Sequence, residues 1–430
     1  MMKRHIIAAA FALFAHNALA ADAADQQMIK QGEYLARAGD CVACHTAKGG
    51  KPFAGGLGLE SPLGTIYSTN ITPDRDTGIG NYSLEDFDRA VRHGVARDGH
   101  SLYPAMPFTS YANVSPADVR ALYAYFMHGV EPVRQENKDT DISWPMSMRW
   151  PLNVWRWMFA PDVVDAPAVP ADSGDAVLRG KYLVEGLGHC STCHTPRGVA
   201  LQEKALSDKD GTAFLSGGKI EGWLAKNLRG DMHDGLGTWT EADIVAFLKG
   251  GRNEHSAAFG GMAQVVEDST QHLTDADLAA IAKYLKTLSP ADPKATQALT
   301  YDDSTYKALS SGQATVRGAM DYINNCATCH RTDGRGWTET FPRLAQSTTV
   351  NTEDPTSLIH IVLQGAEMPW TKAAPTHYAM PGFAARMTDA EVADVVTFIR
   401  SSWGNKAPAV TASQVADIRK EVHAADAPKR

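Results

Sequence analysis

All six cysteines of this 430-residue chain occur in pairs with two residues between them, and a histidine follows each pair directly. On a helical turn, two thiols at this spacing can add to the two vinyl groups of haem, and the adjacent imidazole becomes the proximal iron ligand. The sequence therefore predicts three covalently bound c-type haems. The three motifs are Cys41-Val-Ala-Cys44-His45, Cys190-Ser-Thr-Cys193-His194 and Cys326-Ala-Thr-Cys329-His330.

Paired cysteines also serve three other kinds of chemistry: disulfide bonds, thiol redox exchange and structural zinc. A disulfide or a redox pair leaves the histidine after every cysteine pair unexplained. Structural zinc needs four ligands, usually from two pairs close together, whereas these pairs lie far apart along the chain. The pattern favours haem over all three alternatives.

A methionine precedes the last predicted helix around each motif, where a sixth iron ligand is expected. Methionine suits an electron-carrying haem because its thioether favours ferrous iron and raises the potential. The candidates are Met106, Met262 and Met380, and Met368 is the rival for the third haem. Most of the 14 methionines are expected to fill core gaps, but recurrence at one place favours these three. Histidine ligation is the other alternative, through His100, His255 or His377.

Helical elements that repeat around the motifs must hold these ligands in place. A helix is predicted ahead of each motif, in Gly32-Glu-Tyr-Leu35, Gly180-Lys-Tyr-Leu183 and Arg317–Ile323. An N-cap residue followed three positions later by an acidic residue predicts a last helix after each of Ser115, Thr274 and Thr388. Strand signals are sparse, so the sequence predicts an all-α fold of three tandem helical domains joined by linkers.

The predicted domain boundaries follow this repeat, after a signal peptide at residues 1–20. Residues 25–133, 172–290 and 308–405 are the expected domains, 134–171 and 291–307 the linkers, and 406–430 a C-terminal tail.

The first linker is rich in tryptophan, with Trp144, Trp150, Trp155 and Trp157 beside two arginines. Because a flexible tether is polar, we favour packing of this segment against its own chain. A partner subunit and a membrane surface remain alternatives.

Two asparagines, Asn70 and Asn227, occupy matching places ahead of the glycine-rich segments of the first two regions. Their amides could donate hydrogen bonds to a haem propionate. Satisfying a local turn is an equally good interpretation.

The N-terminus has the pattern of a secretory signal peptide. Lys3 and Arg4 precede the apolar run Ile6–Ala15, and Ala18-Leu19-Ala20 supplies a small-x-small cleavage site. We therefore expect export to the periplasm, with an uncleaved membrane anchor as the weaker alternative because the apolar run is too short to span a bilayer. The formal net charge of -8 leaves no electrostatic footprint for nucleic acid.

On these motifs the chain resembles the three-haem cytochrome c subunits of membrane-associated bacterial dehydrogenases. The resemblance covers about residues 25–405 and rests also on Ser61–Asp74, Leu102–Phe108, Phe398–Asn405 and the Trp-rich linker. It implies class I cytochrome c-like domains. The family's axial ligand positions match His45, His194 and His330 on the proximal side and Met106, Met262 and Met380 on the distal side.

The family serves flavin-dependent gluconate, 2-ketogluconate, glucose, sorbitol and fructose dehydrogenases, and quinoprotein alcohol dehydrogenases. The resemblance implies that a catalytic subunit oxidises the substrate and that this chain passes the electrons to ubiquinone at the periplasmic face of the inner membrane. We favour a flavoprotein of the gluconate, ketogluconate or glucose class as the partner, and a small subunit is a further candidate. Some members end in an amphipathic membrane-binding segment, but this chain is short there.

The chain has no G-x-G-x-x-G fingerprint and no cysteine outside the motifs, so we expect it to have no substrate-oxidising site of its own. Two other functions remain open. One is a free periplasmic multihaem electron shuttle, and the other is a peroxidase-type enzyme, which needs an open sixth position on one iron. A quinoprotein alcohol dehydrogenase is the alternative partner.

Overall fold

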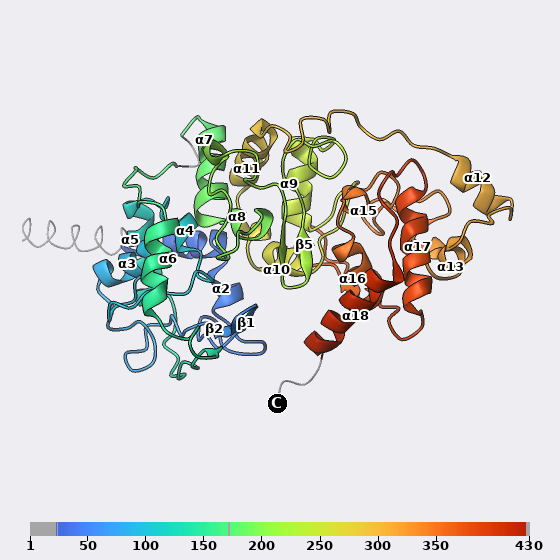
Figure 1. Cartoon of the computed structure of the whole chain (residues 1–430). Coiled ribbons are helices and arrows are strands. Elements are labelled where there is room, and N and C mark those ends of the chain that lie inside the picture. The colour runs from blue at the N-terminus through green and yellow to red at the C-terminus, as the bar shows by residue number, and fades with distance from the viewer. Residues whose placement is uncertain (1–22, 24, 171–172, 427–430) are drawn as a thin grey trace, which may run out of the picture. The chain divides into compact units, whose positions relative to one another are not determined.

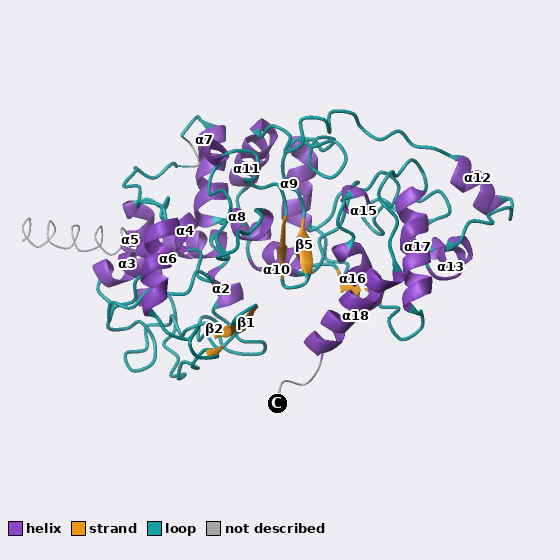
Figure 2. Ribbon diagram, viewed as in Figure 1, coloured by secondary structure: helices purple, strands orange, loops and turns teal. Residues whose placement is uncertain are grey.

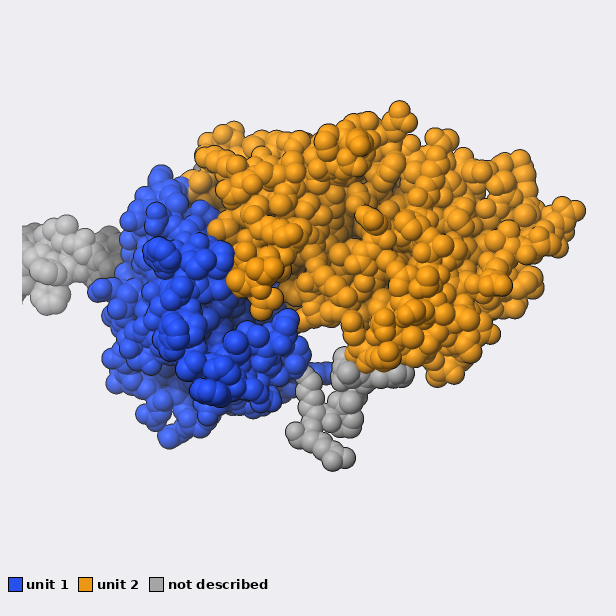
Figure 3. Space-filling model, viewed as in Figure 1, with its two compact units in different colours: residues 1–168 blue, residues 169–430 orange. Residues whose placement is uncertain are grey.

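The computed structural model describes residues 23, 25–170 and 173–426, so the expected signal peptide lies outside the described residues. The chain forms two compact units, Met1–Ala168 and Val169–Arg430 (Figure 3). The first unit holds the first Cys-x-x-Cys-His motif, and the second unit holds the other two.

The first unit is a set of helices with one small antiparallel sheet of order β1-β2-β3 (Figures 1 and 2). Its core includes Phe53 and Phe126, whose rings meet edge to face at 5.3 Å. Its elements are a helix over residues 25–38, α2 (Cys41–Cys44), β1 (Gly58–Ser61), β2 (Gly64–Tyr67), α3 (Leu84–His93), α4 (Phe108–Tyr111), α5 (Pro116–His128), β3 (Asp141–Ile142) and α6 (Trp150–Phe159).

The second unit contains two helical regions, each with one two-stranded antiparallel hairpin, β4-β5 and β6-β7 (Figure 2). The first region comprises α7 (Ala176–Tyr182), η1 (Leu183–Leu187), α8 (Ser191–His194), η2 (Asp208–Asp210), β4 (Gly218–Ile220), β5 (Trp223–Ala225), α9 (Glu241–Gly250), α10 (Gly261–Asp268), η3 (Thr270–His272) and α11 (Asp275–Thr287). The second comprises α12 (Ser304–Ser310), α13 (Ala319–Asn325), α14 (Ala327–His330), α15 (Thr348–Asn351), α16 (Thr356–Gln364), β6 (Gly365–Glu367), β7 (Ala379–Pro381), α17 (Asp389–Ser401) and α18 (Ala412–Asp426).

A glycine at the start of each repeat lets the helix ahead of the motif cross closely over the last helix. A Cβ atom built at Gly32 or Gly180 would lie 1.9 Å from a backbone carbonyl oxygen, and one at Gly318 would lie 2.3 Å away. The repeated glycine is therefore required for close backbone approach. The three facing carbonyls belong to Ala121, Ala280 and Asp394.

The predicted starts of the three last helices are confirmed. Ser115, Thr274 and Thr388 each accept a hydrogen bond from the backbone N–H three residues later. The third also makes the complete reciprocal capping box with Glu391. In the second repeat the acidic residue, Asp277, is buried and pairs with Arg179 through two hydrogen bonds of 2.8 and 2.9 Å.

The prediction of an all-α fold made of three tandem domains joined by linkers is wrong. Helices account for 41% and strands for 8% of the structure, and the chain divides into two units rather than three. The strands are two to four residues long, too short for alternation of apolar and polar residues to reveal them. Part of the predicted first linker belongs to the sheet of the first unit, because Asp141–Ile142 pairs with β2.

The Trp-rich segment packs internally through one of its four tryptophans. Trp155 meets Phe108 edge to face at 6.2 Å and Phe159 at 5.4 Å. The favoured prediction of internal packing is wrong for the other three. Trp144, Trp150 and Trp157 are 79%, 63% and 82% exposed.

The C-terminal tail is largely a helix, α18, which contacts α16 and α17 (Figure 1). Val415, Ile418 and Val422 are buried in the core of this part of the second unit. Arg419 adds a 2.7 Å hydrogen bond to Asp389 at the start of α17. The apolar face of α18 is thus used in packing. None of the described helices has the length and apolar character needed to span a bilayer.

Candidate haem sites

Each Cys-x-x-Cys-His motif lies on a single helical turn. In every copy the backbone N–H of the histidine donates to the backbone carbonyl of the first cysteine, at 2.9 to 3.0 Å. This turn brings both thiols and the imidazole onto one short segment, as covalent haem attachment requires. All six cysteines are free of disulfides and partly buried.

The imidazole rings are held by the same type of contact at all three sites. Nδ1 of His45 lies 2.7 Å from the Thr69 carbonyl oxygen. The corresponding distances are 2.6 Å from His194 to the Lys226 carbonyl and 2.9 Å from His330 to the Pro342 carbonyl. Because a carbonyl oxygen only accepts, Nδ1 must carry the hydrogen, which leaves the Nε2 lone pair available to a metal. Such an outer contact is what orients a ligating histidine.

Burial favours the uncharged form of both the histidines and the first cysteines of the motifs. It lowers the pKa of His45, His194 and His330 below their ordinary value, which favours the neutral, metal-binding imidazole. It also raises the pKa of the first thiol of each pair, Cys41, Cys190 and Cys326, to about 12. A redox-active pair depends on a lowered thiol pKa, so this environment does not suit thiol exchange.

The three candidate distal methionines follow similar antiparallel contacts. Met106 lies in a turn just ahead of α4, after a bridge that joins residues 95 and 101. Met262 is the second residue of α10, after a bridge that joins residues 252 and 257. Met380 lies within β7, opposite Ala366 of β6. All three side chains are partly buried.

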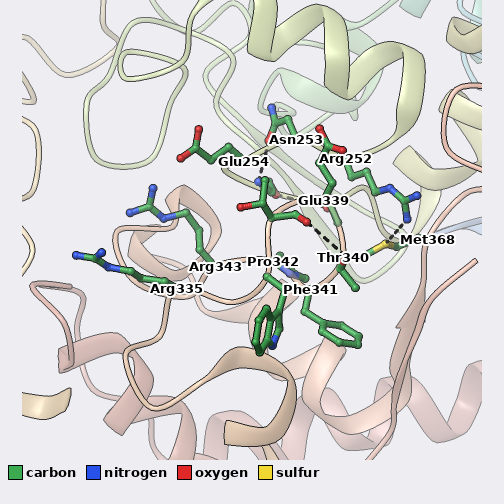
Figure 4. A pocket seen from close by; sticks show the side chains of 14 residues that line it. Arg252, Asn253, Glu254, Arg335, Glu339, Thr340, Phe341, Pro342, Arg343 and Met368 are labelled. Carbon is green, nitrogen blue, oxygen red and sulfur yellow. Dashed lines mark hydrogen bonds between the residues drawn. The ribbon is translucent and has the colours of Figure 1, made fainter. Parts of the chain in front are cut away.

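The rival in the third region, Met368, has a different environment. Its Sδ lies 3.8 Å from Nη1 of Arg252, and it lines a cavity of about 10 Å³, room for one water (Figure 4). The other lining residues include three arginines and two glutamates, so this is a polar setting. Met380 instead packs against the apolar core formed around α16, α17 and α18.

The three alternative histidine ligands each lie beside a carboxylate. His255 is also stacked on Trp239, with ring centroids 5.3 Å apart. The ring nitrogens are 2.5 Å from Asp98 for His100, 3.3 Å from Asp243 for His255 and 3.9 Å from Glu367 for His377.

Two buried polar atoms fit the propionate groups of haem. Trp239 Nε1 and the Tyr103 hydroxyl have no hydrogen-bond partner among the described residues, although both side chains are buried. Trp239 lies close to the second motif, because its ring is 4.8 Å from Nζ of Lys226, whose carbonyl holds His194. A buried donor without a partner is costly, and a propionate would satisfy it. The residues present therefore fit a bound haem.

The asparagine candidates are turn residues in the structure. Asn70 donates through Nδ2 to the Val133 carbonyl at 2.8 Å and accepts from the Thr72 N–H at 2.9 Å. Asn227 accepts from the Arg229 N–H at 2.8 Å. Trp239 carries no sequence signal of such a role beyond its position, which matches Tyr82 in the glycine-rich segment of the first repeat.

Comparison with known proteins agrees with this site. Residues 177–289 and 315–403 match the family described as Cytochrome c, and residues 27–126 match the family described as Cytochrome C oxidase, cbb3-type, subunit III.

Three curated relatives extend over nearly the whole chain. The gluconate 2-dehydrogenase cytochrome c subunit of Pantoea cypripedii is 57% identical over 98% of this chain and 96% of its own length. The cytochrome c subunit of the quinone-type alcohol dehydrogenase of Gluconacetobacter polyoxogenes is 54% identical over 96% of this chain and 88% of its own. The fructose dehydrogenase cytochrome subunit of Gluconobacter japonicus is 36% identical over 92% and 83%.

The motifs and these matches define a c-type cytochrome with covalently bound haem c. The chain belongs to the family of cytochrome c subunits of dehydrogenase complexes, and its role is electron transfer. The predicted family resemblance is thereby confirmed.

Haem supplies one-electron chemistry at its iron, and the protein supplies attachment, ligand orientation and a low-dielectric setting. The cysteines would anchor the group, and the backbone carbonyls of Thr69, Lys226 and Pro342 orient the imidazoles. Partial burial of the motifs would lower the local dielectric around a bound haem, which disfavours the more highly charged ferric state and so favours a raised potential.

Proposed function

We propose that the chain carries three haem c groups, one at each motif, with histidine and methionine as axial ligands. The observation that carries this proposal is the Nδ1–H bond to a backbone carbonyl, which recurs at all three motif histidines and leaves each Nε2 available. The proposed proximal ligands are His45, His194 and His330. The proposed distal ligands are Met106, Met262 and Met380.

Within a complex, we propose that the chain accepts electrons from the catalytic subunit of a membrane-associated periplasmic dehydrogenase and passes them to ubiquinone. The 57% identity to a gluconate 2-dehydrogenase cytochrome subunit favours a flavin-dependent enzyme of the gluconate, ketogluconate or glucose class. A small subunit is a further proposed partner. The proposed location is the periplasmic face of the inner membrane, after removal of residues 1–20.

A quinoprotein alcohol dehydrogenase is the second candidate partner, because a cytochrome subunit of that kind is 54% identical over 96% of the chain. The two candidates differ in the cofactor of the catalytic subunit. Flavin in the purified complex supports the first, and pyrroloquinoline quinone supports the second.

Haem stoichiometry tests the proposal that the chain carries three haems, one at each motif. The chain is produced with a c-type haem attachment system, and haem is counted by intact mass under denaturing conditions, where only covalently bound haem remains. Three haems per chain are expected. Replacing both cysteines of one pair with alanine should remove one haem, and a wild-type count other than three contradicts the proposal.

A further inference from the structure

The hairpin β4-β5 is fastened to the second motif at both of its ends. Ahead of β4, the Gly217 N–H donates to the His194 carbonyl at 2.7 Å. After β5, the Lys226 carbonyl holds the His194 ring at 2.6 Å. Any segment that packs against β5 is therefore mechanically connected to the proposed iron ligand of the second haem.

Helix α16, from the third motif region, packs against this same strand. Ser357 Oγ accepts from the Leu224 N–H at 2.8 Å and donates to the Leu224 carbonyl at 3.1 Å. Lys226 Nζ also bonds to Thr348 Oγ1 at the start of α15. A side chain that pairs with both backbone groups of one residue continues the hydrogen bonding of the strand, so the two regions are joined by directed bonds.

Trp223 and His360 form the aromatic part of this junction. Their rings stack with centroids 3.9 Å apart and planes within 10° of parallel. The His360 ring is bracketed by the Gly222 carbonyl at Nδ1 and by Gln364 at Nε2. A Cβ built at Gly260 would lie 2.9 Å from the indole of Trp223, so this ring is closely confined.

The far end of α16 leads directly to the proposed distal ligand of the third haem. β6 begins at Gly365, the residue after α16, and its Ala366 pairs with Met380. Ile359 and Leu363 of α16 are fully buried, which fixes the helix in the core. A continuous run of bonded and packed atoms therefore extends from the ring of His194 to the strand that carries Met380.

We propose that the junction formed by Trp223, His360 and the Leu224–Ser357 bonds is the bridge through which electrons cross between the second and third haems. This inference rests on the proposed function, since it assumes a haem at each of these motifs. One electron leaves the ferrous iron of one haem and reduces the ferric iron of the other. The two rings keep their oxidation state, and no bond or proton is exchanged.

The physical reason is that tunnelling falls off more slowly through packed and hydrogen-bonded atoms than across a gap. A stack at van der Waals distance supplies that contact in the middle of the junction, beside the polar contacts of Ser357 and Lys226. A substitution that removes one of the two rings should therefore slow electron exchange between the haems without changing the ligands of either haem.

The test compares Trp223→Leu and His360→Leu with two controls in the full haem-loaded chain. Trp223→Phe keeps a ring that can stack, and Trp370→Leu removes a tryptophan that is 51% exposed on the same unit. After flash photoreduction, electron exchange is followed at the bands that a redox titration assigns to each haem. We expect both leucine variants of the junction to slow exchange about tenfold or more, and both controls to stay within about twofold of the wild type.

Haem count, haem potentials and amide hydrogen exchange are measured on the same samples. The expected result is unchanged haem count and potentials, with faster hydrogen exchange in residues 218–226 because the stack also holds β5. Unchanged electron exchange in Trp223→Leu overturns the inference, and if that variant does not fold, His360→Leu decides by the same criterion. A wild-type count below three haems instead contradicts the proposed function.

Discussion

At the scale of single residues, the motif histidines show how much of the site lies in backbone contacts. The Cys-x-x-Cys-His pattern identifies the imidazoles, but their orientation depends on the carbonyls of Thr69, Lys226 and Pro342. Every residue type has a carbonyl, so no sequence pattern marks these partners. The buried Trp239 was similarly hidden, because an aromatic residue in a repeat is usually a core residue.

The choice between two methionines gives a prediction for the third haem. Met380→Ala should leave the haem attached, because attachment uses the cysteines, and should lower its potential through loss of the thioether. Redox titration with absorption spectra measures both effects. Met368→Ala is the matched control and should leave the potential nearly unchanged, since Met368 Sδ faces Arg252. The reverse pattern would assign the ligand to Met368.

The lowered histidine pKa values predict loss of stability in mild acid. Each motif imidazole has a folded-state pKa below the ordinary value of 6.5, and a bond from Nε2 to iron would act in the same direction, so the unfolded chain binds protons more readily. Their contribution is fully present above pH 6.5 and is lost as the pH falls toward the folded-state pKa. We expect the Tm to fall between pH 7 and pH 5, before most carboxylates titrate. A Tm that is constant over this range contradicts the prediction.

At the scale of elements, helices were easier to predict than strands. The caps at Ser115, Thr274 and Thr388 are local signals, and the structure confirms them. The hairpins depend on contacts across turns. Their strands are only two to four residues long, so no alternation of apolar and polar residues is visible in the sequence. α18 was missed because its apolar residues are few and spaced among charges, and the core of the second unit decides its packing.

The helix crossing gives a prediction about stability. Gly180→Ala places a methyl group where the Ala280 carbonyl oxygen lies, so it should reduce the free energy of unfolding by about 1–3 kcal/mol or more. Denaturant titration measures the change. Gly250→Ala is the matched control at the end of α9, because the nearest atom to its added Cβ is 3.8 Å away. Equal effects of the two substitutions would show that the close crossing is unimportant.

At the scale of the whole molecule, the sequence was sufficient for the family and the type of cofactor. The motifs and their flanking segments predicted a dehydrogenase cytochrome subunit, and relatives that span nearly the whole chain confirm it. The division into units could not be predicted in the same way. It depends on contacts such as those of Ser357 with Leu224, which are 133 residues apart in the chain and leave no local pattern.

The exposure of three tryptophans could not be predicted from the sequence either. Three large apolar side chains at Trp144, Trp150 and Trp157 normally indicate burial, yet here they lie on the surface of the first unit. Composition alone could not separate packing against the chain from contact with another surface. The structure decides against internal packing for these three residues.

The most direct test of the account is substrate-driven reduction of the haems in a complex isolated from the native host. The affinity-tagged chain is purified in mild detergent, and its partner's cofactor and the haem spectrum are measured before and after substrate addition. We predict that a flavoprotein dehydrogenase co-purifies, that gluconate, ketogluconate or glucose reduces the haems, and that a ubiquinone analogue reoxidises them. Isolation of the chain without any dehydrogenase, or haems that no sugar or alcohol substrate reduces, would contradict the account.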